Sequence, residues 1–261
     1  MHALSGNQQQ VPTANSVHIW TISLADADLN IPTLDLPELL SNEEIARLGR
    51  IQNHSARKNF LRTRAALRLI LGSYLRCPAV DICFRYNNNG KPELVPGTSD
   101  SLRFNLSHSG SSCLLAVTRD CDVGVDIEHY RTGRDYEALA RRFFSLGEQL
   151  LLENNMGENL FYSMWVLKEA SIKARGMKLL AGLDRFECIL TRDGVLDIVD
   201  KLRQGDHDNW TVKLWQADDN SVAALVSRCQ EAKIIEKMLT DYFRKSDNCI
   251  NVSKIELSYR L

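Results

Sequence analysis

The sequence has 261 residues, enough for one large domain or two small ones with a full hydrophobic core. Its hydrophobic fraction is 44%, its charged fraction is 25% and its formal net charge is −1, as in an ordinary globular protein. This balance gives no overall electrostatic reason to bind nucleic acid or an anionic membrane, so a local group of cations must hold any anionic ligand.

The seven cysteines are scattered and none belongs to a Cys-x-x-Cys pair, so we expect neither a zinc site nor a disulfide framework. The N-terminus lacks the apolar core of a signal peptide, and no run approaches the ~18 apolar residues of a membrane span. These features predict a soluble cytoplasmic protein.

In chain order, the sequence predicts a flexible polar segment and then two mixed groups of helices and strands. Residues 1–16 are polar, and a strand follows at 17–24. Ser41 and Glu44 form a predicted capping box for a first helix, and a second helix is predicted at 54–75. Strands are expected at 81–86, 101–106, 112–117 and 123–128, helices at 134–153 and 160–175, strands at 186–190, 195–199, 211–215 and 222–226, and a last helix at 231–245.

Each group places two helices before a set of strands, which predicts an α+β fold of two similar halves. The expected boundaries are 17–122 for the N-terminal half, 123–230 for the C-terminal half and 231–261 for an appended extension. Because the two halves share only their element order, a single continuous α+β domain remains the alternative.

Residues 123–128, Val-Gly-Val-Asp-Ile-Glu, carry the strongest chemical signal. Side chains alternate between the faces of a strand, so Asp126 and Glu128 point the same way, opposite to the three branched apolar side chains. Two carboxylates this close repel each other unless a cation lies between them. All-oxygen ligands suit a hard ion, so we expect Mg²⁺, with Mn²⁺ as a possible substitute. The alternative is a solvent-facing pair on an edge strand.

The helix predicted at 160–175 presents a second candidate group. Trp165, Glu169 and Lys173 are four residues apart and therefore share one helix face. The alternative for Glu169 and Lys173 is a surface ion pair, which contributes little to stability.

Three further segments are cationic or rich in hydrogen-bond donors. Residues 104–110, Phe-Asn-Leu-Ser-His-Ser-Gly, predict a strand that ends in a turn able to face an anion. Lys91 lies on an Asn-Gly hairpin turn. Seven arginines and lysines on the first two helices form either a solvated face or a source of bidentate phosphate ligands.

The order of these features is more specific than any one of them. Gly-Lys-Pro comes first, then Ser-His-Ser, then Gly-x-Asp-x-Glu, and last Trp-x-x-Lys-Glu-Ala-x-x-Lys. Over residues 41–226 the chain thereby resembles the Sfp-type 4'-phosphopantetheinyl transferases. The resemblance implies coenzyme A bound between two similar α+β halves. It also implies transfer of the 4'-phosphopantetheine group to a serine of an apo acyl or peptidyl carrier protein, with release of 3',5'-ADP.

The resemblance also implies roles by position. The metal-site carboxylates would be Asp126, Glu128 and Glu169. Catalysis would involve Asp126, Glu169 as acceptor of the serine proton, and Lys173 beside the reacting phosphate. The residues implied to contact coenzyme A are Arg47, Arg50, Arg62, Thr63, Lys91, Ser107 and His108.

Carrier proteins of this family are typically acidic and helical, so we expect docking around residues 141–144, Arg-Arg-Phe-Phe. The alternative for Phe143 and Phe144 is a place in the hydrophobic core. We expect a monomer with no nucleic-acid or membrane partner. Carriers of fatty-acid, polyketide, nonribosomal-peptide and polyunsaturated-lipid synthesis fit equally well. Two other classes fit part of the pattern: a magnesium-dependent phosphohydrolase or nuclease, and a non-catalytic module that binds coenzyme A or a carrier.

Overall fold

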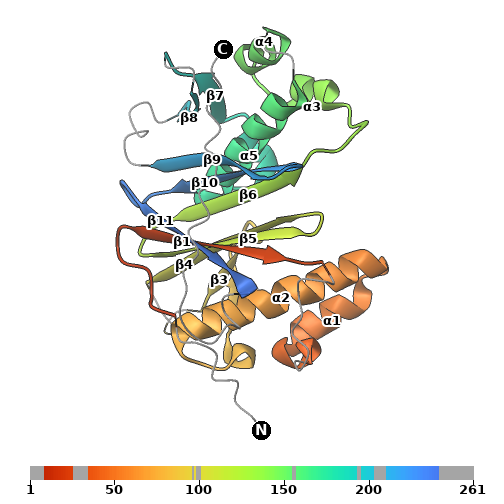
Figure 1. The fold of residues 1–261 in the computed structure, drawn as a ribbon, viewed down its shortest axis with the longest axis vertical. Coiled ribbons are helices and arrows are strands. Elements are labelled where there is room, and N and C mark those ends of the chain that lie inside the picture. The colour runs from red at the N-terminus through yellow and green to blue at the C-terminus, as the bar shows by residue number, and fades with distance from the viewer. Residues whose placement is uncertain are drawn as a thin grey trace.

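The structure is a computed structural model that describes residues 9–25, 35–95, 97, 101–154, 157–192, 195–202 and 210–240. Its helices are α1 (Asn42–Arg50), α2 (His54–Leu75), α3 (Tyr136–Phe143), α4 (Leu146–Asn154), α5 (Glu158–Ala174) and α6 (Leu179–Leu183), with short 3₁₀ turns η1 (Leu36–Leu39) and η2 (Ala79–Asp81). Helix α2 and helix α5 lie on opposite sides of two stacked sheets, which gives four layers (Figure 1).

The first sheet has the strand order β11-β1-β5-β4, and the second has the order β6-β10-β9. Two small hairpins, β2-β3 and β7-β8, lie outside them. All described pairings are antiparallel except that of β1 with β11. The strand bounds are β1 (Ser16–Ser23), β2 (Phe84–Tyr86), β3 (Pro92–Leu94), β4 (Leu102–Ser109), β5 (Ser112–Arg119), β6 (Val123–His129), β7 (Phe186–Leu190), β8 (Leu196–Asp200), β9 (Thr211–Asp218), β10 (Ser221–Ser227) and β11 (Lys233–Met238).

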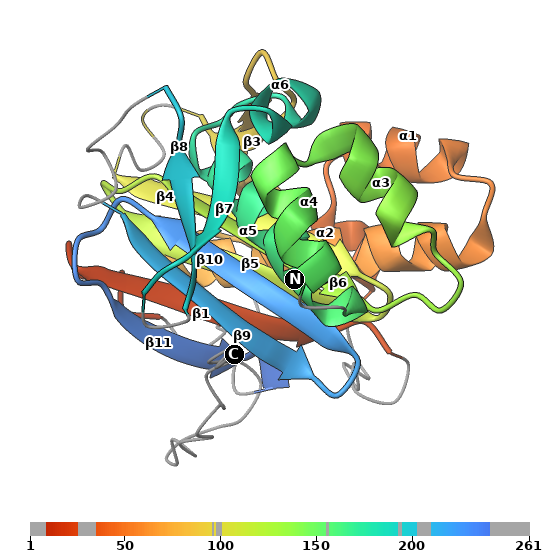
Figure 2. The ribbon, with the colours of Figure 1, turned by 90° about the horizontal axis from the view of Figure 1, so that it is seen from above.

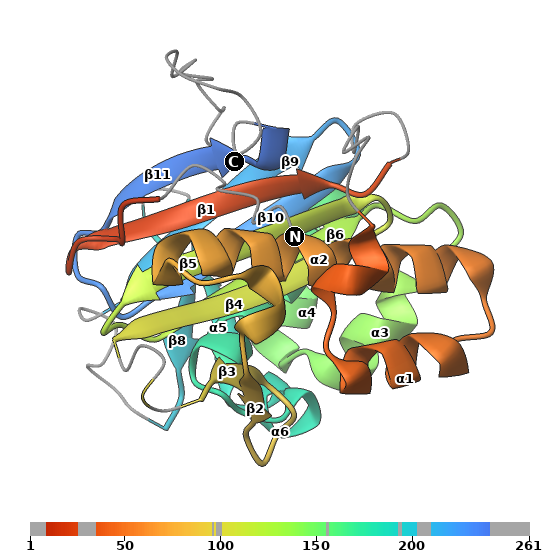
Figure 3. The same ribbon diagram turned by 90° about the horizontal axis from the view of Figure 1, so that it is seen from below.

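Alternation along the strands supplies a hydrophobic core on each side of the first sheet. On β1, Val17 and Ile19 belong to the core between the two sheets, whereas Trp20 and Ile22 belong to the core beneath α2. A third core lies between the second sheet and α5. Seen from above, α3, α4 and α5 lie over the second sheet (Figure 2), and seen from below, α2 crosses the first sheet (Figure 3). Each sheet therefore buries both faces.

The helix starts confirm the local sequence signals. Ser41 accepts a hydrogen bond from the Glu44 amide, 3.3 Å, and Glu44 accepts one from the Ser41 amide, 3.0 Å, so the capping box is present. Helix α2 has the predicted bounds, and the structure confirms a mixed α+β fold. The similarity of the two halves and their boundaries stay predictions.

The C-terminal helix expected at 231–245 is wrong over residues 233–238. These residues form β11, which pairs in parallel with β1 from Ser16–Lys233 to Thr21–Met238. Without β11, the backbone N–H and C=O groups along one edge of β1 would lack strand partners. The hydrogen bonds of this pairing stabilise residues 233–238 as a strand more than their weak amphipathic pattern stabilises a helix. This part of the expected extension is therefore a strand of the first sheet. Residues 241–261 lie outside the described residues.

The expectation of no disulfide is also wrong. Cys121, between β5 and β6, is bonded to Cys229, which follows β10, although 108 residues separate them in the sequence. The fold brings both next to the core between the sheets. Among the helices described, none is long and apolar enough to cross a membrane.

Candidate active site

Strand β6 presents its two carboxylates as the alternation predicts. Val123, Val125 and Ile127 belong to the core between the sheets. Asp126 is 2% exposed, and Glu128 is half-buried. A buried carboxylate needs polar partners.

A glycine lets α5 approach β6 closely. A Cβ atom on Gly124 would lie 2.0 Å from the Ala170 carbonyl oxygen and 2.4 Å from the Ala174 amide nitrogen. The helix backbone therefore rests on the strand at this position. Glu169 and Lys173 flank Ala170 and Ala174 on the helix, so the close approach brings them beside Asp126.

Lys173 connects three elements. Its Nζ donates hydrogen bonds to Asp126 Oδ1, 2.5 Å, and to Ser107 Oγ on β4, 3.0 Å. It also lies 3.4 Å from Glu169 Oε2. Ser107 Oγ donates to Asp126 Oδ1, 2.6 Å. Four predicted site residues from β4, β6 and α5 thus form one polar network.

The Ser-His-Ser segment is part of β4, which runs to Ser109, so the expected turn begins only at Gly110. Ser107 and Ser109 lie on one face of the strand. Ser109 Oγ donates to Glu128 Oε2, 2.9 Å, as Ser107 does to Asp126. His108 is exposed and points to the other face. The serine hydroxyls thus order the acidic pair.

Burial and the negative charge of Asp126 favour the protonated forms of Glu169 and Glu128. Burial, and then the charge of Asp126, raise the pKa of Glu169 to about 7. Burial and Asp126 also raise the pKa of Glu128. Burial lowers the pKa of Lys173, but Asp126 and Glu169 outweigh this, and the pKa is raised. Glu169 can therefore gain or lose a proton near neutral pH, and Lys173 remains charged.

Lys91 touches the end of the helix that carries Lys173. Its Nζ donates to the backbone carbonyls of Lys173, 2.7 Å, and Val123, 3.0 Å. Asn89 Nδ2 donates to the Gly176 carbonyl just beyond α5, 2.5 Å. The β2-β3 turn thus caps the C-terminus of α5. An ammonium group has three N–H donors, and the described residues accept two of them, which leaves one for another ligand.

The remaining residues implied to contact coenzyme A lie outside this network, on α1 and α2. Arg47 stacks on the Phe60 ring at 5.2 Å, and Arg62 donates to the Leu24 carbonyl. Arg50 is exposed and Thr63 is buried. Helix α2 nevertheless reaches the site, because Asn59 Nδ2 donates to the carbonyl of Gly110 after β4, 3.0 Å.

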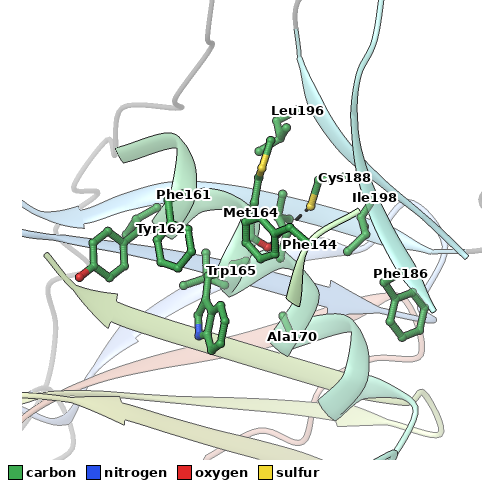
Figure 4. Packing of buried hydrophobic residues seen from close by; sticks show 14 of the residues in the cluster. Phe144, Phe161, Tyr162, Met164, Trp165, Ala170, Phe186, Cys188, Leu196 and Ile198 are labelled. Atoms are coloured by element: carbon green, nitrogen blue, oxygen red, sulfur yellow. Dashed lines mark hydrogen bonds between the residues drawn. The ribbon is translucent and has the colours of Figure 1, made fainter. Parts of the chain in front are cut away.

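The expected docking surface is only partly exposed. Arg141 and Arg142 are exposed, but Phe144 is 6% exposed and stacks on Phe161, with ring centroids 5.3 Å apart (Figure 4). Phe144 is thus a core residue, so the core alternative is confirmed for it and a place on the docking surface is wrong. Phe143 is half-buried against Trp165.

Sequence reasoning missed a buried ion pair beside the site. Lys168 Nζ lies 2.8 Å from both carboxylate oxygens of Glu148, and both side chains are at most 1% exposed. Glu148 also accepts from the amides of Ser145 and Cys188. The spacing Ser145-x-x-Glu148 is a capping-box signal that could have located Glu148. The pair ties α4 and β7 to α5, one residue before Glu169.

The oxygen donors of the cluster fit a hard divalent cation. Within the described residues, no three carboxylate, imidazole or thiolate groups are already arranged around a metal position. Asp126 Oδ2, however, is buried without a hydrogen-bond partner among the described residues, and the charges of Asp126 and Glu128 both raise the pKa of the neighbouring Glu169. Asp126, Glu128 and Glu169 are thus the residues that would hold such an ion.

Comparisons with known proteins agree with this site. Residues 122–226 match the family model described as "4'-phosphopantetheinyl transferase superfamily", and residues 33–120 match "4'-phosphopantetheinyl transferase, N-terminal". These ranges contain every strand and helix that contributes to the network. The chain belongs to the 4'-phosphopantetheinyl transferase superfamily.

Individual relatives carry the same name. The chain is 34% identical over 216 residues to the 4'-phosphopantetheinyl transferase HetI of Nostoc sp. PCC 7120, covering 81% of this chain and 87% of the relative. It is 37% identical over 145 residues to the 4'-phosphopantetheinyl transferase psf-1 of Bacillus pumilus, covering 54% and 58%. It is 40% identical over 94 residues to the 4'-phosphopantetheinyl transferase AcpT of Salmonella typhi, covering 35% and 48%.

Proposed function

We propose that this protein transfers the 4'-phosphopantetheine group of coenzyme A to a serine hydroxyl of an apo acyl or peptidyl carrier protein, in a magnesium-dependent reaction. The observation that carries the proposal is the convergence of Asp126, Glu169 and Lys173 from β6 and α5, with Ser107 bridging them from β4. Family membership names the transferred group.

The proposed reaction is a phosphoryl transfer. The serine oxygen forms a bond to the phosphorus that carries pantetheine, and the phosphoanhydride bond to that phosphorus breaks, so that 3',5'-ADP leaves. Catalysis of this kind depends on positioning and on neutralising negative charge. Magnesium, when bound, would supply further positive charge.

Two side chains are assigned to the chemical step. Glu169 accepts the serine proton, for which a pKa of about 7 is well suited. Lys173 lies beside the same carboxylate and neutralises charge on the transferring phosphoryl group. Asp126 orients Lys173 through their hydrogen bond.

The proposed contacts with coenzyme A use the ammonium group of Lys91 and the imidazole of His108, which acts as a hydrogen-bonding group because burial and then the charge of Lys173 lower its pKa. Lys91 lies next to the backbone of Lys173, and His108 is on the strand that carries Ser107. The exposed arginines Arg47 and Arg50 of α1 are assigned to the nucleotide phosphates, and Arg47 packs on Phe60 of α2, the helix that contacts Gly110.

The test is an assay with coenzyme A, Mg²⁺ and a panel of apo carrier domains from the four carrier classes. Intact mass spectrometry should show the mass of one phosphopantetheine on a carrier, and a carrier whose acceptor serine is replaced by alanine should stay unmodified. Chelation should stop the transfer. Release of free phosphate or cleavage of nucleic acid without carrier modification would instead indicate a hydrolase, and complex formation without modification a binding module.

A further inference from the structure

Side chains of β4 bind the backbone along one edge of strand β6. The opposite edge of β6 pairs with β10, whereas β4 lies beside β6 but belongs to the first sheet. The Val125 amide donates to Asn105 Oδ1, 2.8 Å, and the His129 amide donates to Ser109 Oγ, 3.1 Å. Each of these bonds replaces one that a neighbouring strand would otherwise supply.

The two bonds lie on either side of the acidic pair. Val125 immediately precedes Asp126, and His129 immediately follows Glu128. The backbone groups that point to one edge of a strand come from every second residue, so Val125 and His129 present their amides to the same side. The two carboxylates therefore lie on a backbone segment that is held at both ends.

The side chains that hold this segment belong to a buried row on β4. Asn105, Ser107 and Ser109 are two positions apart, so they share one face of the strand, and all three are at most 7% exposed. Ser107 donates to Asp126 Oδ1 from the middle of the row, 2.6 Å. The row thus contacts β6 at its backbone on both sides and at a carboxylate between them.

The hydrogen bonds of Ser109 have a fixed direction. A serine hydroxyl has one proton, and a backbone N–H group can only donate to it. Because Ser109 Oγ accepts from the His129 amide, its own proton goes to Glu128 Oε2, 2.9 Å. One hydroxyl thereby joins the backbone of β6 to the carboxylate of the preceding residue.

The position of β6 also determines which partners Lys173 has. Lys173 Nζ on α5 donates to Asp126 Oδ1, 2.5 Å, and Asp126 is 2% exposed. A buried hydrogen bond of this length is lost when the strand and the helix move apart by about 1 Å, and a displacement of that size at reacting groups can lower a rate about a hundredfold.

We propose that Asn105 and Ser109 are positioning residues, which hold the backbone of β6 on both sides of Asp126 and Glu128 and so fix these carboxylates relative to Lys173. The two residues act through the carboxylates rather than on a substrate. Their effect on the rate rests on the proposed transfer reaction, whereas their effect on the ammonium group of Lys173 does not.

The kinetic test compares Asn105→Leu, which keeps the approximate size but cannot accept a hydrogen bond, with Ser109→Ala. In both variants kcat for transfer to an apo carrier domain should fall about ten- to a hundredfold, the usual range when a group that orients such residues is lost. The Kd for coenzyme A, measured by calorimetry, should change by less than about threefold. Ser111→Ala, at an exposed turn position near Ser109, is the control and should match the wild type in both quantities.

A second measurement does not require transfer. ¹⁵N NMR detects lysine ammonium groups that hydrogen bonds protect from exchange with water, and Lys173→Arg identifies the signal of Lys173. This signal should shift or disappear in Asn105→Leu and in Ser109→Ala. The signal of Lys168, which is buried against Glu148 on α4, should persist and shows that each variant is folded.

An unchanged Lys173 signal in both variants, or a wild-type kcat in both, would overturn the proposal. A loss of coenzyme A affinity as large as the loss of kcat would also overturn it, because the two residues would then act on ligand binding. Where Asn105→Leu loses the Lys168 signal, Ser109→Ala, which removes a single oxygen atom, decides. Where the wild type transfers no phosphopantetheine, the proposed function fails, and the ammonium signals still test the positioning of Asp126.

Discussion

At the scale of residues, the site is a cluster with more negative than positive groups. Lys173 bonds to Asp126 and lies near Glu169, while Glu128 is held by Ser109. Burial is the larger cause of the raised pKa of Glu169, and repulsion by the charge of Asp126 adds to it. A pKa near neutrality suits the role of proton acceptor that we propose for Glu169.

Glu169→Gln should lower kcat by about 10²–10⁴ with little change in coenzyme A affinity, because the amide keeps the shape but cannot accept the serine proton. Steady-state transfer kinetics and calorimetric titration of coenzyme A measure the two quantities. Glu153→Gln, at an exposed position on α4, is the matched control and should behave as wild type. A wild-type kcat in Glu169→Gln would refute its role as base.

A second residue-scale prediction concerns His18, which is buried beside Tyr74. Trp20 Nε1 donates to the Tyr74 hydroxyl, 2.9 Å, and the same hydroxyl forms a hydrogen bond of 2.7 Å with His18 Nδ1. Burial, and then the charge of Lys237, lower the pKa of His18 to about 4. The unfolded chain binds this proton near pH 6.5 and the folded chain does not, so stability falls as pH decreases from 6.5 towards 4.

The expected loss over this range is about 2–3 kcal/mol in the free energy of unfolding. Urea denaturation at successive pH values measures it. His18→Gln keeps an acceptor for Tyr74 but cannot titrate, so its stability should depend less on pH in this window. His54→Gln, at an exposed position, should retain the wild-type slope. Equal slopes in His18→Gln and wild type would contradict the assignment.

At the scale of elements, α5 is held from three directions. It rests on Gly124 of β6, its C-terminus is capped by Lys91 and Asn89 of the β2-β3 turn, and the buried Glu148–Lys168 pair ties it to α4. Helix position rather than side-chain flexibility therefore sets the distances among the catalytic groups.

Gly124→Ala should destabilise the fold by at least about 3 kcal/mol, because a Cβ 2.0 Å from the Ala170 carbonyl forces the helix away from the strand. Transfer activity should fall with it, since Glu169 and Lys173 move away from Asp126. Gly49→Ala is the control: its Cβ meets nothing within 4 Å, and alanine should stabilise helix α1 by about 0.5–1 kcal/mol. Denaturant midpoints of the two variants and the wild type measure these changes in stability. Unchanged stability in Gly124→Ala would contradict the packing argument.

At the scale of the whole molecule, two sheets share one core and a helix covers each outer face. The two sheets pack through Val17 and Ile19 of β1 and Val125 and Ile127 of β6. The C-terminal β11 returns to the first sheet, and the Cys121–Cys229 bond joins the segments that enter and leave the second sheet. These links make the two sheets one unit.

Reduction of the disulfide should lower the free energy of unfolding. A bond that closes a loop across 108 residues stabilises by up to about 4–5 kcal/mol in the chain-entropy account. Urea midpoints with and without reductant should differ for the wild type but not for Cys121→Ala/Cys229→Ala. Identical wild-type midpoints under the two conditions, with the bond shown to be open under reductant, would contradict the prediction.

Local sequence patterns determined much of this protein. Some features depend only on residues a few positions apart, and these can be predicted from the sequence. They are the apolar periodicity of α2, the capping box at Ser41, and the alternation that places Asp126 and Val125 on opposite faces of β6. The order of the motifs likewise predicted the family, and the resemblance implied that the elements carrying Asp126 and Glu169 converge.

Only the tertiary structure decided the rest, because those features depend on pairs far apart in sequence. β11 forms because it completes the edge of β1, and Cys121 meets Cys229 because β5, β6 and β10 bring them together. Phe144 is buried because Phe161 covers it, and Ser107 turns to Asp126 because β4 meets β6. Propensity and spacing carry no information on which distant surface a residue will contact; packing energy selects it.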